Sequence, residues 1–220
     1  VGWQNAINVA DTEAKKLRDL GADMVIALSH LGYRDNDVVY YDRGIAMNTK
    51  HIDMIIGGHT HTFINRADYV TSLDGDKVPV VQTGSKGICL GYAKVKLDKN
   101  GKPSFDYRLI PVKKHLDSKV DKAFSDMIDV YSATVTEKMN EVIGYCPQAI
   151  RKGNPESPLG NLTADGLIWM AKEKYGVDAD VSLYNSGGIR AELSKGNLTL
   201  GDIYAVYPFD NVLTLLDMKG

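Results

Sequence analysis

Three of the five histidines stand where apolar runs of the kind that form buried strands come to an end. His30 follows residues 23–29, and both His59 and His61 follow residues 52–56 and a pair of glycines. Ligands collect at the carboxyl ends of strands in open α/β sheets, and side chains two residues apart in an extended segment point to one side. Neutral imidazole suits zinc, iron, manganese and similar ions. The pattern favours a metal site over the commoner role of a lone histidine in packing or on the surface.

A second group of residues has the chemistry to hold a phosphate-bearing or carboxylate-bearing ligand. Asn185 offers hydrogen-bond donors and acceptors, and Gly187 and Gly188 permit close approach of the backbone. Arg190 provides a planar fork that matches phosphate or carboxylate oxygens. Phe209 can stack on a nucleobase, although a phenylalanine taken alone is more often a core residue.

The elements that must position the histidines alternate between helix and strand. Apolar residues at helical spacing predict a helix over residues 8–20. Continuous apolar runs predict strands at 23–29, 52–56 and 78–82, each buried on both faces. With a short helix over 43–51, this alternation predicts α/β layering.

The second part of the chain begins with a predicted hairpin, because strand-like runs flank an Asn-Gly turn at residues 100–101. A polar helix over 118–139 is interpreted as a linker. Further predictions are a helix over 161–175, strands over 179–184 and 212–218, and a short helix over 200–206 capped by Thr199.

The composition excludes some classes of protein. Apolar residues form 44% and charged residues 25% of the 220 residues, as in soluble globular proteins. The formal charge of −2, with no basic stripe, argues against a nucleic-acid polymer as partner. No apolar run approaches the ~20 residues that cross a bilayer. Cys89 and Cys146 fit no zinc motif and leave their oxidation state open. Neither end has the features of a natural terminus, so we expect a piece of a longer chain.

Ordered motifs give the sequence a specific resemblance. Residues 28–32, 53–61 and 82–84 resemble the second half of a calcineurin-like metallophosphoesterase domain, and residues 159–165, 185–190 and 208–211 resemble a 5'-nucleotidase C-terminal domain. Together these motifs resemble the 5'-nucleotidase family. The resemblance implies an α/β fold that comprises the C-terminal half of a four-layer metallophosphoesterase sandwich over residues 1–113, a linking helix over 114–140 and a truncated substrate-binding domain over 141–220.

The resemblance also implies two divalent metal ions, zinc, manganese or similar, in the full-length protein. His30 and His59 match ligands of one ion, and His61 matches a ligand of the other. The family's early carboxylate ligands and catalytic histidine have no counterpart in the 29 residues before His30. No catalytic residue is therefore assigned in this chain, which we expect to be inactive alone. His51 and His115 lack the context of the other three and are interpreted as structural.

Substrate-binding roles follow from the same resemblance. The matched residues are Asn185, Gly187, Gly188, Arg190, Phe209, Asn211 and Arg151. In the family, the asparagine, glycines and arginine bind the ribose and phosphate region, while the phenylalanine forms half of a clamp on the base. Asn211 matches a polar position near the base, and Arg151 matches an arginine that precedes the Gly-Asn-Leu motif.

The resulting hypothesis is a metal-dependent phosphoric ester hydrolase of the 5'-nucleotidase type, whose partner is a nucleotide or related phosphate ester. The alternatives are 2',3'-cyclic-nucleotide phosphodiesterase with 3'-nucleotidase activity, UDP-sugar hydrolysis, and a non-catalytic nucleotide-binding module. The resemblance further implies a periplasmic, cell-surface or secreted location.

Overall fold

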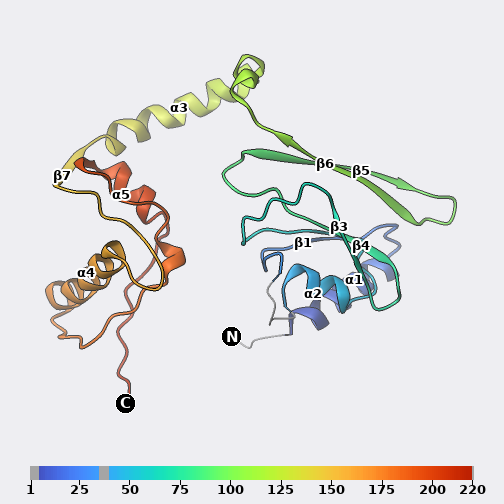
Figure 1. The fold of residues 1–220 in the computed structure, drawn as a ribbon, viewed down its shortest axis with the longest axis horizontal. Coiled ribbons are helices and arrows are strands. Elements are labelled where there is room, and N and C mark those ends of the chain that lie inside the picture. Colours follow the sequence, from blue (N-terminus) through green and yellow to red (C-terminus); the bar gives the residue numbers. More distant parts are fainter. Residues whose placement is uncertain (1–4, 35–39, 220) are drawn as a thin grey trace. The chain divides into compact units, whose positions relative to one another are not determined.

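The computed structural model describes residues 5–34 and 40–219, which form two compact units. The first unit extends to Val120 and the second begins at Asp121 (Figure 1). The predicted division into residues 1–113, 114–140 and 141–220 remains a prediction about the family's domains. Within the described parts of the chain, every helix is too short or too polar to span a membrane.

The first unit is built on a four-stranded sheet in the order β1-β2-β4-β3, with α1 and α2 packed beside it (Figure 1). Strands β1, β2 and β4 run parallel, and β3 is antiparallel to β4. The elements are α1 (Ala6–Asp19), β1 (Ile26–Leu28), α2 (Asp42–Met47), β2 (Met54–Ile56), β3 (Asp68–Thr71) and β4 (Lys77–Val81). The predicted alternation of helix and strand is therefore confirmed.

The core of this unit joins its helices to its sheet. Ala14 from α1, Ile45 from α2, Ile55 from β2 and Val80 from β4 belong to one buried cluster. Helix α1 begins where the side chain of Asn5 accepts hydrogen bonds from two backbone N–H groups of the first turn, which satisfies donors that have no partner inside the helix.

The prediction that all three parallel strands are buried on both faces is wrong for β1. It spans only Ile26–Leu28, and Leu28 is 82% exposed. The reason is its place at the edge of the sheet, whereas β2 and β4 lie between neighbours. Apolar sequence alone does not distinguish an edge strand from a central one.

The predicted hairpin is confirmed as β5 (Cys89–Leu97) and β6 (Pro103–Pro111), which pair along their full length. Its turn is closed by Asp98, whose Oδ1 accepts hydrogen bonds from the backbone N–H groups of Asn100 and Lys102 at 2.7 and 2.9 Å. A short 3-10 helix, η1 (Lys114–Lys119), follows. Cys89 and Cys146 are both free thiols.

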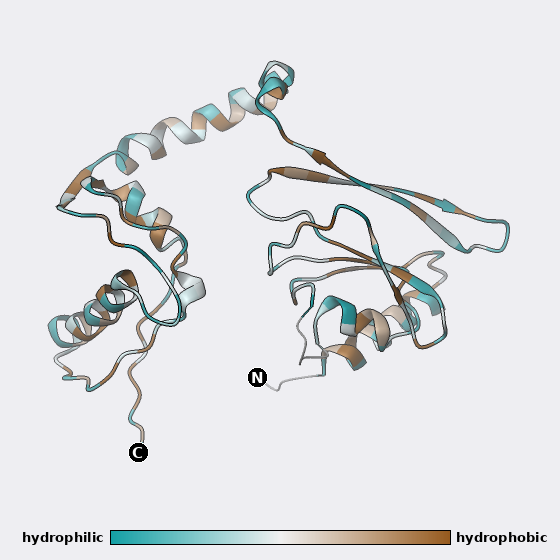
Figure 2. Ribbon diagram, viewed as in Figure 1, coloured by the Kyte–Doolittle hydropathy of each residue, from teal (hydrophilic) through white to brown (hydrophobic). Residues whose placement is uncertain are grey.

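The second unit begins with α3 (Lys122–Met139), along which hydrophobic and hydrophilic residues are interspersed (Figure 2). Its large side chains, Phe124 and Tyr131 among them, are exposed. The remaining elements are β7 (Val142–Cys146), α4 (Pro158–Tyr175), the 3-10 helix η2 (Ser186–Gly188), β8 (Gly196–Thr199) and α5 (Leu200–Val206). Strands β7 and β8 pair antiparallel. The buried core cluster contains Cys146, Leu159, Ile189 and Val206, so α4 and α5 pack on the loop that follows η2.

Two predicted strands of this unit are wrong. Residues 179–184 and 212–218 lie within the described chain and form no strand, and Leu183 and Val212 are exposed. An apolar run becomes a strand only where a neighbouring strand satisfies its backbone N–H and C=O groups. Neither segment has such a neighbour among the described residues.

Candidate functional site

The ends of β1 and β2 bring two of the three predicted metal ligands together. The imidazole centroids of His30 and His59 lie 5.2 Å apart, with the rings at 73°. The strand ends themselves are joined, because the backbone N–H of Ser29 donates to the carbonyl of Ile56 at 2.9 Å. We call the pair His30 and His59, with the strand ends that carry them, the histidine edge.

The two glycines before His59 are needed for this approach. A Cβ at Gly58 would lie 2.9 Å from Nδ1 of His30, and a Cβ at Gly57 would collide with the side chain of Asp42. His59 itself adopts a φ of 67°, a conformation uncommon for residues other than glycine. The Gly-Gly-His sequence thus lets the backbone after β2 pass close to both His30 and Asp42.

Gln82, directly after β4, holds the segment that carries His59 and His61. Its side chain is buried, its Nε2 donates to the carbonyl of Gly58 at 2.7 Å, and its Oε1 accepts from the backbone N–H of Thr62. The side-chain amide of Gln82 therefore binds the backbone both before His59 and after His61. The sequence showed Gln82 only as part of a family motif, and its end-of-strand position was the available signal.

Asp42, the first residue of α2, is fully buried beneath the histidine edge. Ser29 Oγ donates a hydrogen bond to Asp42 Oδ1, while Oδ2 has no partner among the described residues. Burial raises the pKa of the Asp42 carboxyl, and the Ser29 hydrogen bond and the nearby His30 oppose this shift. Sequence reasoning missed Asp42, because an acidic residue at a helix start needs no further explanation.

The histidine edge suits part of a metal site but not a whole one. Imidazole nitrogens are good zinc ligands, yet a structural zinc site has four ligands and a catalytic one has three from the protein. Across residues 5–34 and 40–219, no group of three or more His, Cys, Asp or Glu side chains is arranged to hold a metal ion. His61 adopts a φ of 53°. Its role as a metal ligand remains a prediction, and so does the presence of the metal ion.

The second unit brings together several of the predicted substrate-binding residues. The guanidinium carbon of Arg190 lies 5.8 Å from the ring centroid of Phe209, within the range of a cation–π contact. Asn211 Nδ2 donates to Tyr184 Oη at 3.1 Å. We call Arg190, Phe209, Asn211 and Tyr184 the arginine–phenylalanine cluster. Phe209 is 52% exposed, so the core role that phenylalanine commonly takes does not apply to it.

The Gly-Gly turn positions Arg190 in this cluster. A Cβ at Gly188 would lie 2.7 Å from the ring of Tyr184, whereas a Cβ at Gly187 would meet nothing closer than 3.5 Å. Arg190 is held from both sides, because its Nη1 donates to the carbonyl of Gly187 at 3.1 Å and its backbone N–H donates to the carbonyl of Val206 at 2.8 Å. Gly188 therefore has a steric reason to be glycine, and Gly187 has none in this structure.

A cavity of about 390 Å³ opens beside the same loop. It is lined by the segment from Lys152 to Ser157, the first turns of α4, and residues that include Tyr184 and Ser186. Tyr184 therefore belongs both to the cavity wall and to the arginine–phenylalanine cluster. Asn185 and Arg151, predicted to bind substrate, are neighbours of lining residues and are not themselves in the wall.

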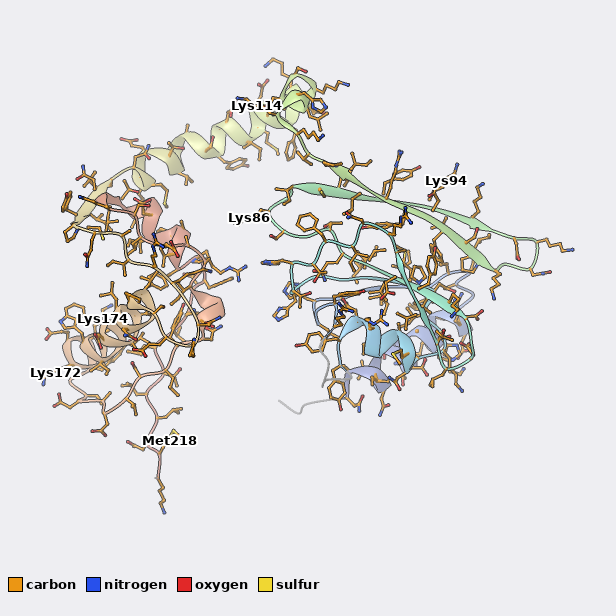
Figure 3. The ribbon with its side chains drawn as sticks, in the orientation of Figure 1. Lys86, Lys94, Lys114, Lys172, Lys174 and Met218 are labelled. Atoms are coloured by element: carbon orange, nitrogen blue, oxygen red, sulfur yellow. The ribbon has the colours of Figure 1, made fainter. Side chains whose placement is uncertain are left out.

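Five lysines labelled in Figure 3 are spread over several segments of the two units. Lys86 lies in a loop, Lys94 on β5 and Lys114 in η1, while Lys172 and Lys174 are on α4 (Figure 3). Lys172 also pairs with Asp178 at 2.6 Å.

Known proteins resemble this chain along nearly its whole length. Residues 133–220 match the family model described as 5'-nucleotidase, C-terminal domain. The chain is 31% identical over 225 residues to the trifunctional nucleotide phosphoesterase protein YfkN of Bacillus subtilis (strain 168), covering 99% of this chain and 14% of that protein. It is 28% identical over 246 residues to human 5'-nucleotidase, covering 99% of this chain and 41% of that enzyme.

A solved structure agrees with these relatives. The crystal structure of a 5'-nucleotidase precursor from Thermus thermophilus matches 93% of this chain and 42% of its own, with a TM-score of 0.70 and 26% identity. The chain thus spans less than half the length of the relatives it matches. The resemblance to the 5'-nucleotidase family seen in the ordered motifs and the mixed α/β fold are both confirmed: residues 133–220 match the family's C-terminal domain, and the whole chain is similar to 5'-nucleotidases.

Proposed function

We propose that this chain serves in the metal-dependent hydrolysis of nucleotide phosphate esters, in a protein of the 5'-nucleotidase type. One observation carries the proposal: a chain similar to 5'-nucleotidases over 99% of its length contains both the histidine edge and the arginine–phenylalanine cluster. An imidazole pair suits a metal ion, and an exposed arginine over an aromatic ring suits a phosphate and a base.

The first unit has the metal-holding role in this proposal. His30 and His59 would hold one divalent ion, zinc, manganese or similar, and His61 would contribute to a second. Bound divalent ions supply Lewis-acid polarisation of phosphoryl oxygens and stabilise the charge that develops on them. Gln82 keeps the His59 loop against β4 through its hydrogen bonds to Gly58 and Thr62, so that the imidazoles stay at the carboxyl ends of β1 and β2.

The second unit has the substrate-binding role. Arg190 would bind phosphate or ribose oxygens and Phe209 would stack on the base, with Asn211 beside it. Asn185, Gly187, Gly188 and Arg151 complete the proposed contacts. The exposure of Phe209 supports stacking, because a half-exposed aromatic face is available to a ligand.

Three other functions are alternatives. Phosphodiester hydrolysis of 2',3'-cyclic nucleotides with 3'-nucleotidase activity, or UDP-sugar hydrolysis, would use the same ion chemistry and differ only in the substrate pocket. A non-catalytic nucleotide-binding module is favoured by the fact that no three-residue ligand group occurs among the described residues.

We also propose the exported location, periplasmic, cell-surface or secreted, that the family resemblance implies.

The test measures phosphate release from AMP by the 220-residue chain, alone and joined to a segment that carries the family's acidic ligands. We expect no turnover from the chain alone, and turnover of ~1–10³ per second with the added segment and Mn²⁺ or Zn²⁺. A His59→Ala version of the joined protein is the control for contaminating phosphatase.

A substrate panel of AMP, 2',3'-cyclic AMP and UDP-glucose separates the candidate hydrolases. Binding of AMP without turnover of any compound by the joined protein would favour the non-catalytic module. If AMP is neither bound nor hydrolysed, the proposal is wrong.

A further inference from the structure

The carboxylate of Asp42 lies between the two strand ends that form the histidine edge. The backbone N–H of Asp42 donates to the carbonyl of Gly32 at 2.8 Å, which ties the start of α2 to the loop after β1. The Oδ1 atom of Asp42 accepts a hydrogen bond from Ser29 Oγ. Ser29 is the residue immediately before His30, so Asp42 is connected to the first histidine through one side chain.

The other carboxylate oxygen lies against the second strand end. A Cβ at Gly57 would collide with Asp42 Oδ2 and would lie 3.0 Å from its Cγ. Gly57 is two residues before His59, and its backbone N–H donates to the carbonyl of Val81 of β4 at 2.8 Å. Asp42 therefore touches the chain just before each of the two imidazoles.

A purely structural spacer at this position would not need a charge. Asp42 is fully buried, and Oδ2 has no hydrogen-bond partner among the described residues. Burying an ionised carboxylate with an unpaired oxygen is costly. An asparagine of the same size would still accept the Ser29 hydrogen bond through its Oδ1 and would bury no charge.

The unpaired charge has a use if a cation sits at the imidazoles. Neutral histidines bring no negative charge to a divalent ion, and buried charges interact over longer range than exposed ones. Carboxylates that accept a hydrogen bond from a metal-binding histidine orient its ring and strengthen metal binding. Asp42 acts one step further away, through Ser29 and the backbone at Gly57.

We propose that Asp42 is a positioning residue of the histidine edge. It fixes the strand ends that carry His30 and His59, through Ser29 and Gly57, and supplies the negative charge that favours a divalent cation there. The inference rests on the proposed metal site of the first unit, and it adds a residue from a different element of the chain than either histidine.

The decisive variant is Asp42→Asn, which keeps the size and the acceptor for Ser29 and replaces the charged Oδ2 by an uncharged amide nitrogen. Asp19→Asn is the matched control, since Asp19 is an exposed carboxylate at the end of α1 whose partner is Lys15. Ser29→Ala tests the connection between Asp42 and His30, because it leaves the charge of Asp42 in place and removes the hydroxyl that donates to Asp42.

The experiment titrates the 220-residue chain with Co²⁺ and follows the imidazole ¹⁵N signals of His30 and His59, together with the visible absorption of the bound ion. Melting curves are recorded without metal. We expect Asp42→Asn to weaken Co²⁺ binding by about 10–100-fold, with a metal-free melting temperature equal to or above that of the unaltered chain. Ser29→Ala should change the absorption spectrum, and Asp19→Asn should change neither readout.

The outcomes separate this inference from the proposed function. If the unaltered chain binds Co²⁺ and Asp42→Asn binds it equally well, the role of Asp42 is wrong and the metal site stands. A metal-free melting temperature that falls with unchanged affinity would make Asp42 a structural residue only. If the unaltered chain leaves both imidazole signals unaffected by Co²⁺, the metal site fails and the inference fails with it.

Discussion

The histidine edge and the arginine–phenylalanine cluster are built in different ways. His30 and His59 follow hydrogen-bonded parallel strands, and buried polar side chains, Asp42 and Gln82, hold the backbone around them. Arg190 and Phe209 lie on loops and meet near the surface, where Phe209 is half-exposed. The first region is fixed by the interior of its unit, and the second by a few contacts that solvent reaches.

This difference matches what each proposed ligand requires. Metal ions impose bond lengths and angles on their ligands, with Zn–N distances of about 2.0–2.1 Å, so the residues around them must be held tightly. A nucleotide brings a flat base and charged oxygens that tolerate small displacements, because stacking accepts any base. We therefore expect substitutions at the histidine edge to have larger effects than substitutions in the arginine–phenylalanine cluster, and to affect metal content and turnover together.

The largest effect should come from His59→Ala. The change removes one of the two imidazoles that lie together, and a metal site that loses a ligand loses most of its affinity. We expect metal content and any turnover in the joined protein to collapse, while AMP binding by the second unit is retained. Metal content by atomic emission and AMP affinity by calorimetry measure the two halves of this contrast.

His115→Ala is the matched control for this prediction, since His115 lies exposed in η1, outside the four-stranded sheet. The two variants should differ in metal content and agree in melting temperature. A His59→Ala protein that keeps its metal would contradict the assignment of the histidine edge.

Intermediate effects are expected in the cluster. Phe209→Ala should weaken AMP binding by the ~1–3 kcal/mol of one base stack, and Arg190→Ala should weaken it by removing a charge-assisted contact. Neither change should alter metal content, because both residues belong to the second unit. Calorimetry with AMP and with adenosine separates the phosphate contact of Arg190 from the base contact of Phe209.

Phe124→Ala provides the control, because Phe124 is an exposed aromatic residue on α3 of the same unit. It should leave AMP affinity unchanged. If Phe209→Ala lowers the melting temperature sharply and leaves AMP affinity as it was, Phe209 supports the fold and the stacking role has to be withdrawn.

The same contrast explains how far the sequence could be read. The histidine edge was predictable, because apolar runs mark strands and ligands collect at the ends of parallel strands. Asp42 and Gln82 were not, because their roles depend on contacts with the Ser29 hydroxyl and with the Gly58 carbonyl, which lie 13 and 24 residues away along the chain. Such contacts follow from packing, which has no local signature.

The second unit was harder to read for a related reason. Its candidate residues have types that suit a nucleotide, but residues 179–184 were expected to be a strand and form none. The apolar residues of this segment are equally compatible with a strand and with irregular backbone. The missing information was the presence or absence of a strand alongside, which a single segment cannot contain.

The smallest effect concerns the helix that leads into Phe209. Helix α5 begins with a capping box, in which Thr199 Oγ1 accepts from the backbone N–H of Asp202 and the Asp202 carboxylate accepts from the backbone N–H of Thr199 at 2.8 Å. The Thr199 hydroxyl also donates to Asp202 Oδ2 at 2.8 Å. The hydrogen bond from the backbone N–H of Thr199, and after it the one from the hydroxyl, lower the pKa of Asp202. A lowered pKa means that the ionised carboxylate favours the fold above the ordinary aspartate pKa of about 3.9, and that this contribution is lost as the pH falls through the lowered value.

Thr199→Ala should move the Asp202 pKa upward, towards its ordinary value, because it removes the hydroxyl donor and leaves the backbone one. A carboxyl ¹³C titration by NMR measures the shift, and Asp178, an exposed aspartate in the same unit, serves as the reference signal. AMP affinity should change less than in Arg190→Ala, because the backbone N–H of Arg190 is tied to Val206 in the last turn of α5 and not to its capped first turn. A loss of AMP affinity as large as that of Arg190→Ala would mean that the cluster depends on its scaffold as closely as the histidine edge does, and the distinction between the two regions would no longer hold.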